Sequence, residues 1–240
     1  MGSFASVLVA RVPERLGIHG KSRCRSCKKE ISFYDNIPLI SFTLLRGRCR
    51  FCKVRISFIY PALELFTVLG TVIIVKHFDS WILCTAWVIF LTFGLSLSVI
   101  DQRNKRLPDA LTLPLYLILM AILGLDGVIN QHMGNFLVSL ASSILLAGFY
   151  FLLNLVSRGG MGLGDAKFAL SVGLLTGYVS AFNAVASTFL AFFLGALIGV
   201  IAIVFGVADR KSSLAFGPFI FMGVLLGPWF SPILEKLLSF

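Results

Sequence analysis

Charged side chains are scarce in this sequence: Asp, Glu, Lys and Arg make up only 13% of its 240 residues. A soluble domain carries about 25%. Hydrophobic residues instead make up 58% of the chain, and a water-soluble globule has too little interior to hide that much apolar surface. The scarcity of charge therefore excludes an ordinary soluble protein and predicts that lipid surrounds most of the chain.

Several catalytic signatures are also missing. The three histidines, His19, His77 and His132, lie far apart in the sequence, and neither HExxH nor GxSxG occurs. The Gly-rich stretch before Asp165 is not followed by Gly-Lys-Ser/Thr. These absences exclude the usual metalloprotease, serine hydrolase and P-loop sites. No cleavable signal peptide is evident either, so we expect the membrane segments themselves to direct insertion.

Long apolar runs follow one another from residue 58 onward. A helix of about 20 apolar residues crosses a bilayer core of about 30 Å, and backbone in lipid must satisfy its own hydrogen bonds. We expect helices over residues 58–76, 81–100, 110–130, 134–157, 165–180, 183–207 and 214–231. With residues 1–12 as a short first transmembrane segment, the sequence predicts an all-α polytopic membrane protein of about eight transmembrane helices.

The basic residues, which give a formal net charge of +10, are unevenly distributed. If residues 11–57 are cytoplasmic and the helices alternate in direction, the loops 101–109, 157–165 and 208–213 face the cytoplasm as well. These four segments hold 18 of the 21 Lys and Arg residues. Because Lys and Arg collect in cytoplasmic loops, this asymmetry predicts the orientation. It also explains the positive net charge by membrane insertion and by contact with anionic lipid headgroups, rather than by binding to nucleic acid.

Four cysteines form two CxxC pairs, Cys24–Cys27 and Cys49–Cys52. Two such pairs can supply four thiolates to one tetrahedral Zn²⁺ and leave no open coordination position. Disulfides or redox motifs are the alternative, but the predicted cytoplasmic location is reducing. We therefore expect residues 13–57 to form a small domain that a structural zinc ion holds together, because so short a segment has little core of its own.

An acid next to the membrane, Asp101, ends the predicted 81–100 helix, and Pro108-Asp109 begins the next. Proline pre-sets a helix start, so we interpret Asp109 as an N-cap or first-turn acid. Asp101 has a simpler alternative as a solvated acid paired with Arg103 or Lys105. A negative charge at a helix C-terminus is nevertheless unfavourable, which favours another role.

A second acid follows a stretch with four glycines in six residues, Gly159 to Gly164, and begins the predicted 165–180 helix. Glycine lets the backbone approach a partner closely. Asp165 is either a helix cap or, in the pattern Gly162-Leu163-Gly164-Asp165, the second member of an acid pair. Glycines 162 and 164 and Pro108 are then the supporting loop residues.

The predicted topology places Asp101 and Asp165 at one membrane depth on different helices. Two neighbouring carboxyl groups cannot both ionise cheaply, so they share a proton. Such a pair can activate water as a base and protonate a leaving amine as an acid. An aspartyl peptidase needs no other catalytic group, and we expect residues 58–240 to form such a transmembrane domain.

These motifs resemble those of the bacterial type IV prepilin peptidases, which are GxGD membrane aspartyl proteases. The resemblance runs over nearly the whole chain and rests on Gly2 to Pro13, Asp35 to Cys52, Tyr60-Pro61-Ala62-Leu63-Glu64-Leu65, Asp101 with Leu107-Pro108-Asp109, Gly162-Leu163-Gly164-Asp165 and Phe216-Gly217-Pro218-Phe219. The first helix is shorter than the family's, and Phe58 stands where a basic residue is expected.

The resemblance implies a substrate, a location and a second activity. The substrates are prepilins or pseudopilins of pilus or type II secretion systems, cut after a glycine at the cytoplasmic face of the bacterial inner membrane. Members with the four-Cys loop also methylate the new N-terminus with S-adenosylmethionine. The motifs assign no pocket for this methyl donor, and Glu64 is a candidate only because an acid at a helix entry is costly.

Two alternatives belong to other classes of protein. An ion- or proton-coupled transporter would carry acids near the middle of the bilayer and show repeated halves. A membrane adaptor that binds a partner through its zinc loop would need one anchoring helix rather than seven or eight. The substrate pilin and the oligomeric state are not encoded in any motif.

Overall fold

The computed structural model describes residues 2–14, 17, 24, 26–31, 38–157, 161–207 and 214–238. Some predicted features lie outside these residues: positions 35–37 of the predicted zinc loop, Gly159 and Gly160 of the Gly-rich stretch, and the basic loop 208–213.

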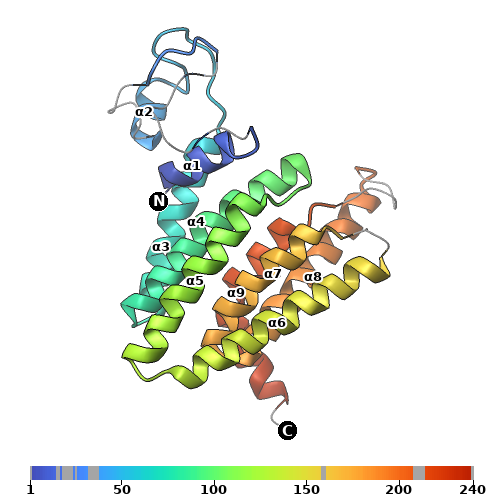
Figure 1. Cartoon of the computed structure of the whole chain (residues 1–240). Helices are drawn as coiled ribbons and strands as arrows, with labels where there is room; N and C mark the ends of the chain where they lie inside the picture. The colour runs from blue at the N-terminus through green and yellow to red at the C-terminus, as the bar shows by residue number, and fades with distance from the viewer. Residues whose placement is uncertain are drawn as a thin grey trace.

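Nine helices form the described part of the chain (Figure 1). They are α1 (Gly2–Arg11), α2 (Pro38–Leu44), α3 (Ile59–His77), α4 (Trp81–Asn104), α5 (Asp109–Ile129), α6 (Met133–Val156), α7 (Leu163–Val179), α8 (Ala181–Val204) and α9 (Gly217–Leu238). An isolated antiparallel bridge joins Arg48 and Arg55 in the cysteine loop. The prediction of an all-α fold is confirmed.

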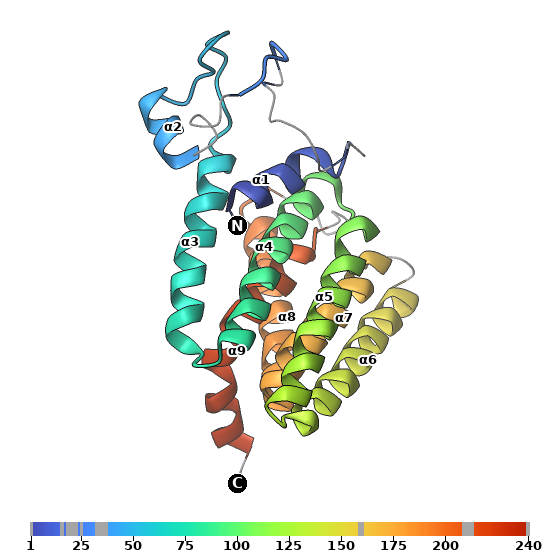
Figure 2. The same cartoon turned by 60° about the vertical axis from the view of Figure 1, so that its left-hand side comes forward.

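Six of the helices, α3 to α6, α8 and α9, are long and apolar enough to cross a membrane. Helix α7 has 17 residues and α1 has ten. Ten helical residues reach about 15 Å, half of a bilayer core. Helix α1 lies across the ends of α3 and α4 (Figure 2). The assignment of residues 1–12 as a transmembrane segment stays a prediction.

Helices α4 and α7 form the centre of the bundle. Fourteen of the 24 residues of α4 and twelve of the 17 of α7 are buried. Phe90 of α4 stacks on Phe168 of α7 with ring centroids 5.7 Å apart and on Phe221 of α9 at 6.2 Å. Aromatic pairs of this kind add about 0.5–1.5 kcal/mol each beyond the area they bury. The short α7 is thus held by protein on most sides.

Close packing of small residues builds two helix pairs. An added Cβ at Gly173 of α7 would lie 2.5 Å from the carbonyl oxygen of Ser142 in α6. At Gly223 and Gly227 of α9, an added Cβ would overlap Ser187 of α8. The spacings Gly173-xxx-Gly177 and Gly223-xxx-Gly227 are the small-xxx-small pattern that lets helix backbones approach in lipid. The sequence analysis did not identify these pairs.

The predicted helix boundaries differ from the observed ones mainly in α4 and α9. Helix α4 continues through Asp101 to Asn104, where Lys105 adopts the left-handed conformation with φ 51°. Asp101 therefore lies within the last turn rather than at the end. Helix α9 begins at Gly217 and continues to Leu238 through two prolines. Helix α2, inside the predicted loop domain, was not anticipated.

Candidate functional site

Asp101 and Asp165 lie at the same end of the bundle. Helices α4, α6 and α8 finish at this end and α5, α7 and α9 begin there, together with α1 and the cysteine loop (Figures 1 and 2). We call it the basic end. Each acid is only 6% exposed. Buried carboxyl groups are costly unless partnered, so the contacts of these two are informative.

Asp101 joins α4 to the start of α9. Its Oδ2 atom accepts a hydrogen bond of 2.9 Å from the backbone N–H of Gly217. An added Cβ at Gly217 would lie 2.9 Å from the same oxygen. Only glycine fits this approach, which explains its position at the N-terminus of α9. The N-terminal end of α9 also offsets the unfavourable field that the C-terminus of α4 exerts on a negative charge.

Asp165 caps a helix with one carboxylate oxygen, and its other oxygen has no hydrogen-bond partner among the described residues. Its Oδ2 atom accepts a hydrogen bond of 3.1 Å from the backbone N–H of Gly162, the residue before α7. Its Oδ1 atom is buried and has no hydrogen-bond partner among the described residues. The prediction that Asp165 is a helix cap is therefore right for Oδ2, whereas Oδ1 is available to a ligand.

Three contacts bring the start of α7 against α4 and α5. An added Cβ at Gly164 would lie 2.9 Å from the Cβ of Leu107. Lys167 bonds both carboxylate oxygens of Asp109, at 2.7 and 2.8 Å. The carboxyls of Asp101 and Asp165 lie close enough for the charge of one to act on the other. Of the predicted supporting residues, Gly162 contacts Asp165, Gly164 packs on Leu107, and Pro108 is the N-cap of α5.

Asp109 is a first-turn acid of α5, which is one of the two roles predicted for it, and it also forms an ion pair. It is the first residue of α5, but no side-chain capping hydrogen bond forms at this terminus. Its carboxylate instead pairs with Lys167, with both side chains about half exposed. An exposed ion pair contributes up to about 1 kcal/mol, so this contact aligns α5 and α7 more than it stabilises them.

An aromatic cluster contains Tyr150, which interacts with Asp165; of this cluster the sequence analysis named only Phe216, in the Phe216-Gly217-Pro218-Phe219 motif. Tyr150 of α6 is 1% exposed and interacts electrostatically with Asp165. Its ring centroid lies 6.3 Å from that of Phe216, the residue before α9, and Phe192 lies 4.9 Å from Phe216. No motif joins residues so far apart in sequence, so only the fold reveals this cluster.

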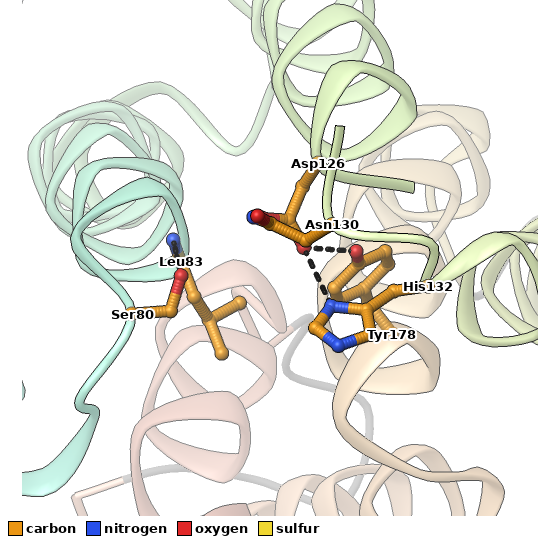
Figure 3. Close-up of polar contacts among 6 residues, drawn as sticks. All are labelled: Ser80, Leu83, Asp126, Asn130, His132 and Tyr178. Atoms are coloured by element: carbon orange, nitrogen blue, oxygen red, sulfur yellow. Dashed lines mark hydrogen bonds and ion pairs between the residues drawn. The ribbon is translucent and has the colours of Figure 1, made fainter. Parts of the chain in front are cut away.

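A third buried acid, Asp126 on α5, occupies the opposite end of the bundle and was also missed (Figure 3). Tyr178 donates a hydrogen bond to its Oδ2, and Asn130 donates one of 2.7 Å to its Oδ1. His132 Nδ1 lies 3.3 Å from Oδ2. Both oxygens are therefore partnered, in contrast to Asp165. Such a satisfied network joins α5, the α5–α6 connection and α7, and is structural.

The four predicted zinc ligands come together. The Sγ atoms of Cys24, Cys27, Cys49 and Cys52 all lie within 4.8 Å of one another, and those of Cys24 and Cys52 are 3.7 Å apart. Four sulfurs around Zn²⁺ at about 2.3 Å are about 3.8 Å from each other. The cluster therefore has the dimensions that a tetrahedral metal ion requires, and its thiol composition suits zinc.

The two halves of this cluster have the same backbone. Cys24 N–H bonds Lys29 O and Lys28 N–H bonds Cys24 O, both at 2.9 Å. The second half repeats the pattern, with Cys49 N–H to Val54 O and Lys53 N–H to Cys49 O at 2.9 and 3.0 Å. Lys28 and Lys53 both have positive φ, 59° and 58°. Two matching knuckles that accept this strain indicate a fold organised around a shared ion.

The thiols of the first knuckle titrate at different pH values. The backbone N–H of Cys27 is the largest influence that lowers the pKa of Cys24, to about 7. The pKa of Cys27 is raised to about 11: the backbone N–H of Lys29 lowers it, but burial and the neighbouring thiols outweigh that effect. The Cys24 thiolate thus forms readily, and its negative charge opposes the ionisation of Cys27. A bound cation would relieve this repulsion.

Comparisons with known proteins match both parts of the chain. The profile described as "Bacterial Peptidase A24 N-terminal domain" matches residues 1–78. The profile described as "Type IV leader peptidase family" matches residues 87–204, which include both acids of the basic end.

Curated relatives match most of the chain. The protein named prepilin leader peptidase/N-methyltransferase from Neisseria gonorrhoeae is 35% identical over 91% of this chain and 82% of its own length. Its namesake from Pseudomonas aeruginosa is 30% identical over 92% and 83%. The namesake from Bacillus subtilis is 27% identical over 94% and 88%. No solved structure matches this chain.

Proposed function

The chain belongs to the type IV leader peptidase family, and we propose that Asp101 and Asp165 are the catalytic pair with which it cuts prepilin or pseudopilin leaders after a glycine. One observation carries the proposal. Two buried carboxyl groups from different helices lie at the same end of the bundle, and one oxygen of Asp165 has no hydrogen-bond partner among the described residues.

The geometry supports a shared-proton mechanism. Gly217 N–H fixes the carboxyl of Asp101, and Gly162 N–H fixes that of Asp165. With one proton between them, the ionised group takes a proton from water while the other polarises the scissile carbonyl. The oxygen of that water bonds to the carbonyl carbon and gives a tetrahedral intermediate. The carbon–nitrogen bond then breaks as the pair returns a proton to the leaving amine, and the carbonyl carbon becomes the new carboxyl group of the leader.

The orientation of the enzyme in the inner membrane follows from its charge. The basic end carries the cysteine loop and the predicted cytoplasmic loops, so the acids face the cytoplasm. A prepilin whose basic leader begins in the cytoplasm and continues as an apolar helix would present its cleavage site at this depth. A transporter would instead need unsatisfied acids near the bilayer centre, whereas the buried Asp126 is fully hydrogen-bonded.

We propose two cofactors. A structural Zn²⁺ is held by the four-cysteine cluster, whose dimensions fit it. S-adenosylmethionine is the methyl donor for N-methylation of the new N-terminus; the relatives' name gives N-methyltransferase for those proteins. When bound, it supplies a methyl group activated on a sulfonium.

The peptidase assignment is tested by cleavage of a purified prepilin. Asp101→Asn and Asp165→Asn should each reduce the rate by about a thousandfold or more while the protein remains in the membrane. Asp79→Asn is the matched control because Asp79 is exposed in the connection between α3 and α4, at the other end of the bundle. Either Asn variant cutting at the wild-type rate would remove that acid from the mechanism. Mass spectrometry of the product reports whether the cut follows a glycine.

A further inference from the structure

A cavity of about 440 Å³ opens at the basic end between α1, the cysteine loop and the start of α3. Tyr60 and Pro61, in the first turn of α3, line it, so it lies at the level where the apolar span of α3 begins. Helix α1 crosses the end of α3 beside it (Figure 2). Its volume is within the usual range of a small-molecule site, about 300–1,000 Å³. The cavity therefore lies where lipid headgroups meet the protein, and neither Asp101 nor Asp165 lines it.

Positive charge converges on this cavity from three parts of the chain. The arginines of the lining are Arg11 at the end of α1, Arg50 and Arg55 in the cysteine loop, and Arg103 in the last turn of α4. Among the described residues, no acidic side chain lines the cavity. The cysteine cluster borders it, and a zinc ion with four thiolates would offset about half of the arginine charge. Because a cleft with an excess of one charge attracts ions of the other sign, the lining indicates an anionic ligand.

Two of these arginines, Arg55 and Arg103, are available to such a ligand. Within the described part of the chain, neither forms a side-chain hydrogen bond or an ion pair. Arg11, in contrast, donates a hydrogen bond of 3.3 Å to the carbonyl oxygen of Gly17. Guanidinium groups bind phosphate oxygens through paired, charge-assisted hydrogen bonds. Since Arg55 lies in the cysteine loop and Arg103 on the bundle, a phosphate that contacts both would also hold the loop against α4.

An apolar stripe on α3 leads from the cavity along the membrane span. Pro61 lines the cavity, and the stripe continues through Leu65, Val68 and Val72. These positions follow Pro61 at i+4, i+7 and i+11, which share one face of a helix. Their side chains are 49%, 53% and 48% exposed. An acyl chain attached to the anionic group can lie on this stripe, whereas a free phosphate ion makes no use of it.

We propose that this cavity binds the headgroup of an anionic phospholipid, with Arg55 and Arg103 on the phosphate and an acyl chain along Leu65 and Val68 of α3. Basic pockets beside membrane spans are a known form of headgroup site. A basic peptide, such as the leader of a prepilin, is repelled by the same arginines. The bound lipid fixes the cysteine loop to the last turn of α4, and this role does not depend on the peptidase assignment.

The test is native mass spectrometry of the full chain in detergent, titrated with dioleoyl phosphatidylglycerol or with dioleoyl phosphatidylcholine, whose choline cation the arginines repel. The wild type should prefer phosphatidylglycerol, and Arg55→Ala and Arg103→Ala should each weaken its binding by roughly tenfold or more. Arg48→Ala and Arg106→Ala are the matched controls, because each removes one exposed charge at the same end and neither residue lines the cavity. Zinc content and melting temperature identify variants that fold. If Arg55→Ala does not fold, Arg103→Ala tests the site from outside the cysteine loop.

Several results would overturn this proposal. Equal affinity of the wild type for the two lipids would show that the charge of the headgroup is not recognised. Folded Arg55→Ala and Arg103→Ala variants that bind phosphatidylglycerol like the wild type would remove the cavity from lipid binding. Equal losses in all four arginine variants would indicate diffuse attraction to the basic end rather than a site. Inorganic phosphate or glycerol phosphate that displaces the lipid at equal concentration would identify a site for a soluble anion instead.

Discussion

Three glycines lie where the backbone packs around Asp101 and Asp165. Gly162 donates to Asp165, Gly217 donates to Asp101, and Gly164 packs on Leu107. None of these three is required for a positive φ, because the only glycines with positive φ among the described residues are Gly47 and Gly206. Close approach rather than backbone strain therefore explains Gly164 and Gly217, whereas an added Cβ at Gly162 would make only ordinary contacts, the nearest at 3.4 Å from Asp165 Oδ2.

Gly164→Ala should displace the start of α7, because the added Cβ would lie 2.9 Å from Leu107 Cβ and 3.4 Å from its backbone N and O. A misplacement of about 1 Å costs roughly a hundredfold in rate. We expect prepilin cleavage to fall by about that factor while α7 still forms. In Gly134→Ala, the added Cβ meets nothing within 4 Å. That control should cleave normally, and equal rates for the two variants would contradict the close-approach account.

Tyr178→Phe should lower stability without affecting catalysis, since it removes one of the donors to the buried Asp126 at the end away from the catalytic pair. Leaving a buried acceptor short of a partner costs about 1–3 kcal/mol. Thermal melting in detergent measures the loss, with Tyr116→Phe on α5 as control. A large drop in cleavage rate per folded molecule would show that this network is coupled to the chemistry.

At the scale of helices, the sequence predicted where the membrane spans lie along the chain but not which helices pack together. Apolar length is a local property, so each predicted range overlaps an observed helix and matches its ends within a few residues, except that α9 continues past residue 231 to Leu238. The acids could be predicted to lie together because alternating helices return to one face. The contacts of Asp126 and the choice of α6 with α7 depend on residues brought together by folding, which no local pattern reveals.

Gly173→Ala should weaken the α6–α7 pair, since its Cβ would lie 2.5 Å from a backbone oxygen that cannot rotate away. Overpacking of this kind costs about 1–3 kcal/mol. Gly148→Ala is the same substitution on α6 with open space around it, and should gain about 0.5–1 kcal/mol from helix propensity. Melting temperatures that rise equally in both variants would disprove the packing role.

At the scale of the whole molecule, two parts differ in what stabilises them. The bundle is built on buried Phe90, Phe168 and Phe221 at the centre of the helices. Among the described residues of the segment 24–56, Cys49 is the only hydrophobic residue that belongs to the buried core. We therefore expect the proposed metal ion to stabilise the loop and not the bundle.

Removing the metal should accordingly unfold the loop and spare the helices. We expect about one zinc per chain by elemental analysis, and less than a tenth of that in Cys49→Ser or after chelation. Limited proteolysis should then cut within residues 13–57, while the helical circular dichroism changes little. Cys84→Ser is the matched control, because Cys84 lies on α4 outside the cluster. A metal-free preparation with a protease-resistant loop would contradict this prediction.

The catalytic pair is tested most directly by comparing Asp101→Asn, Asp165→Asn and the double variant in one prepilin cleavage assay. Groups that act as a unit are strongly non-additive, since losing either one disables both. The account predicts that both single variants fall to the same residual rate and that the double variant falls no further. Independent, multiplying losses, or a single variant that still cuts at the wild-type rate, would contradict a shared proton between Asp101 and Asp165.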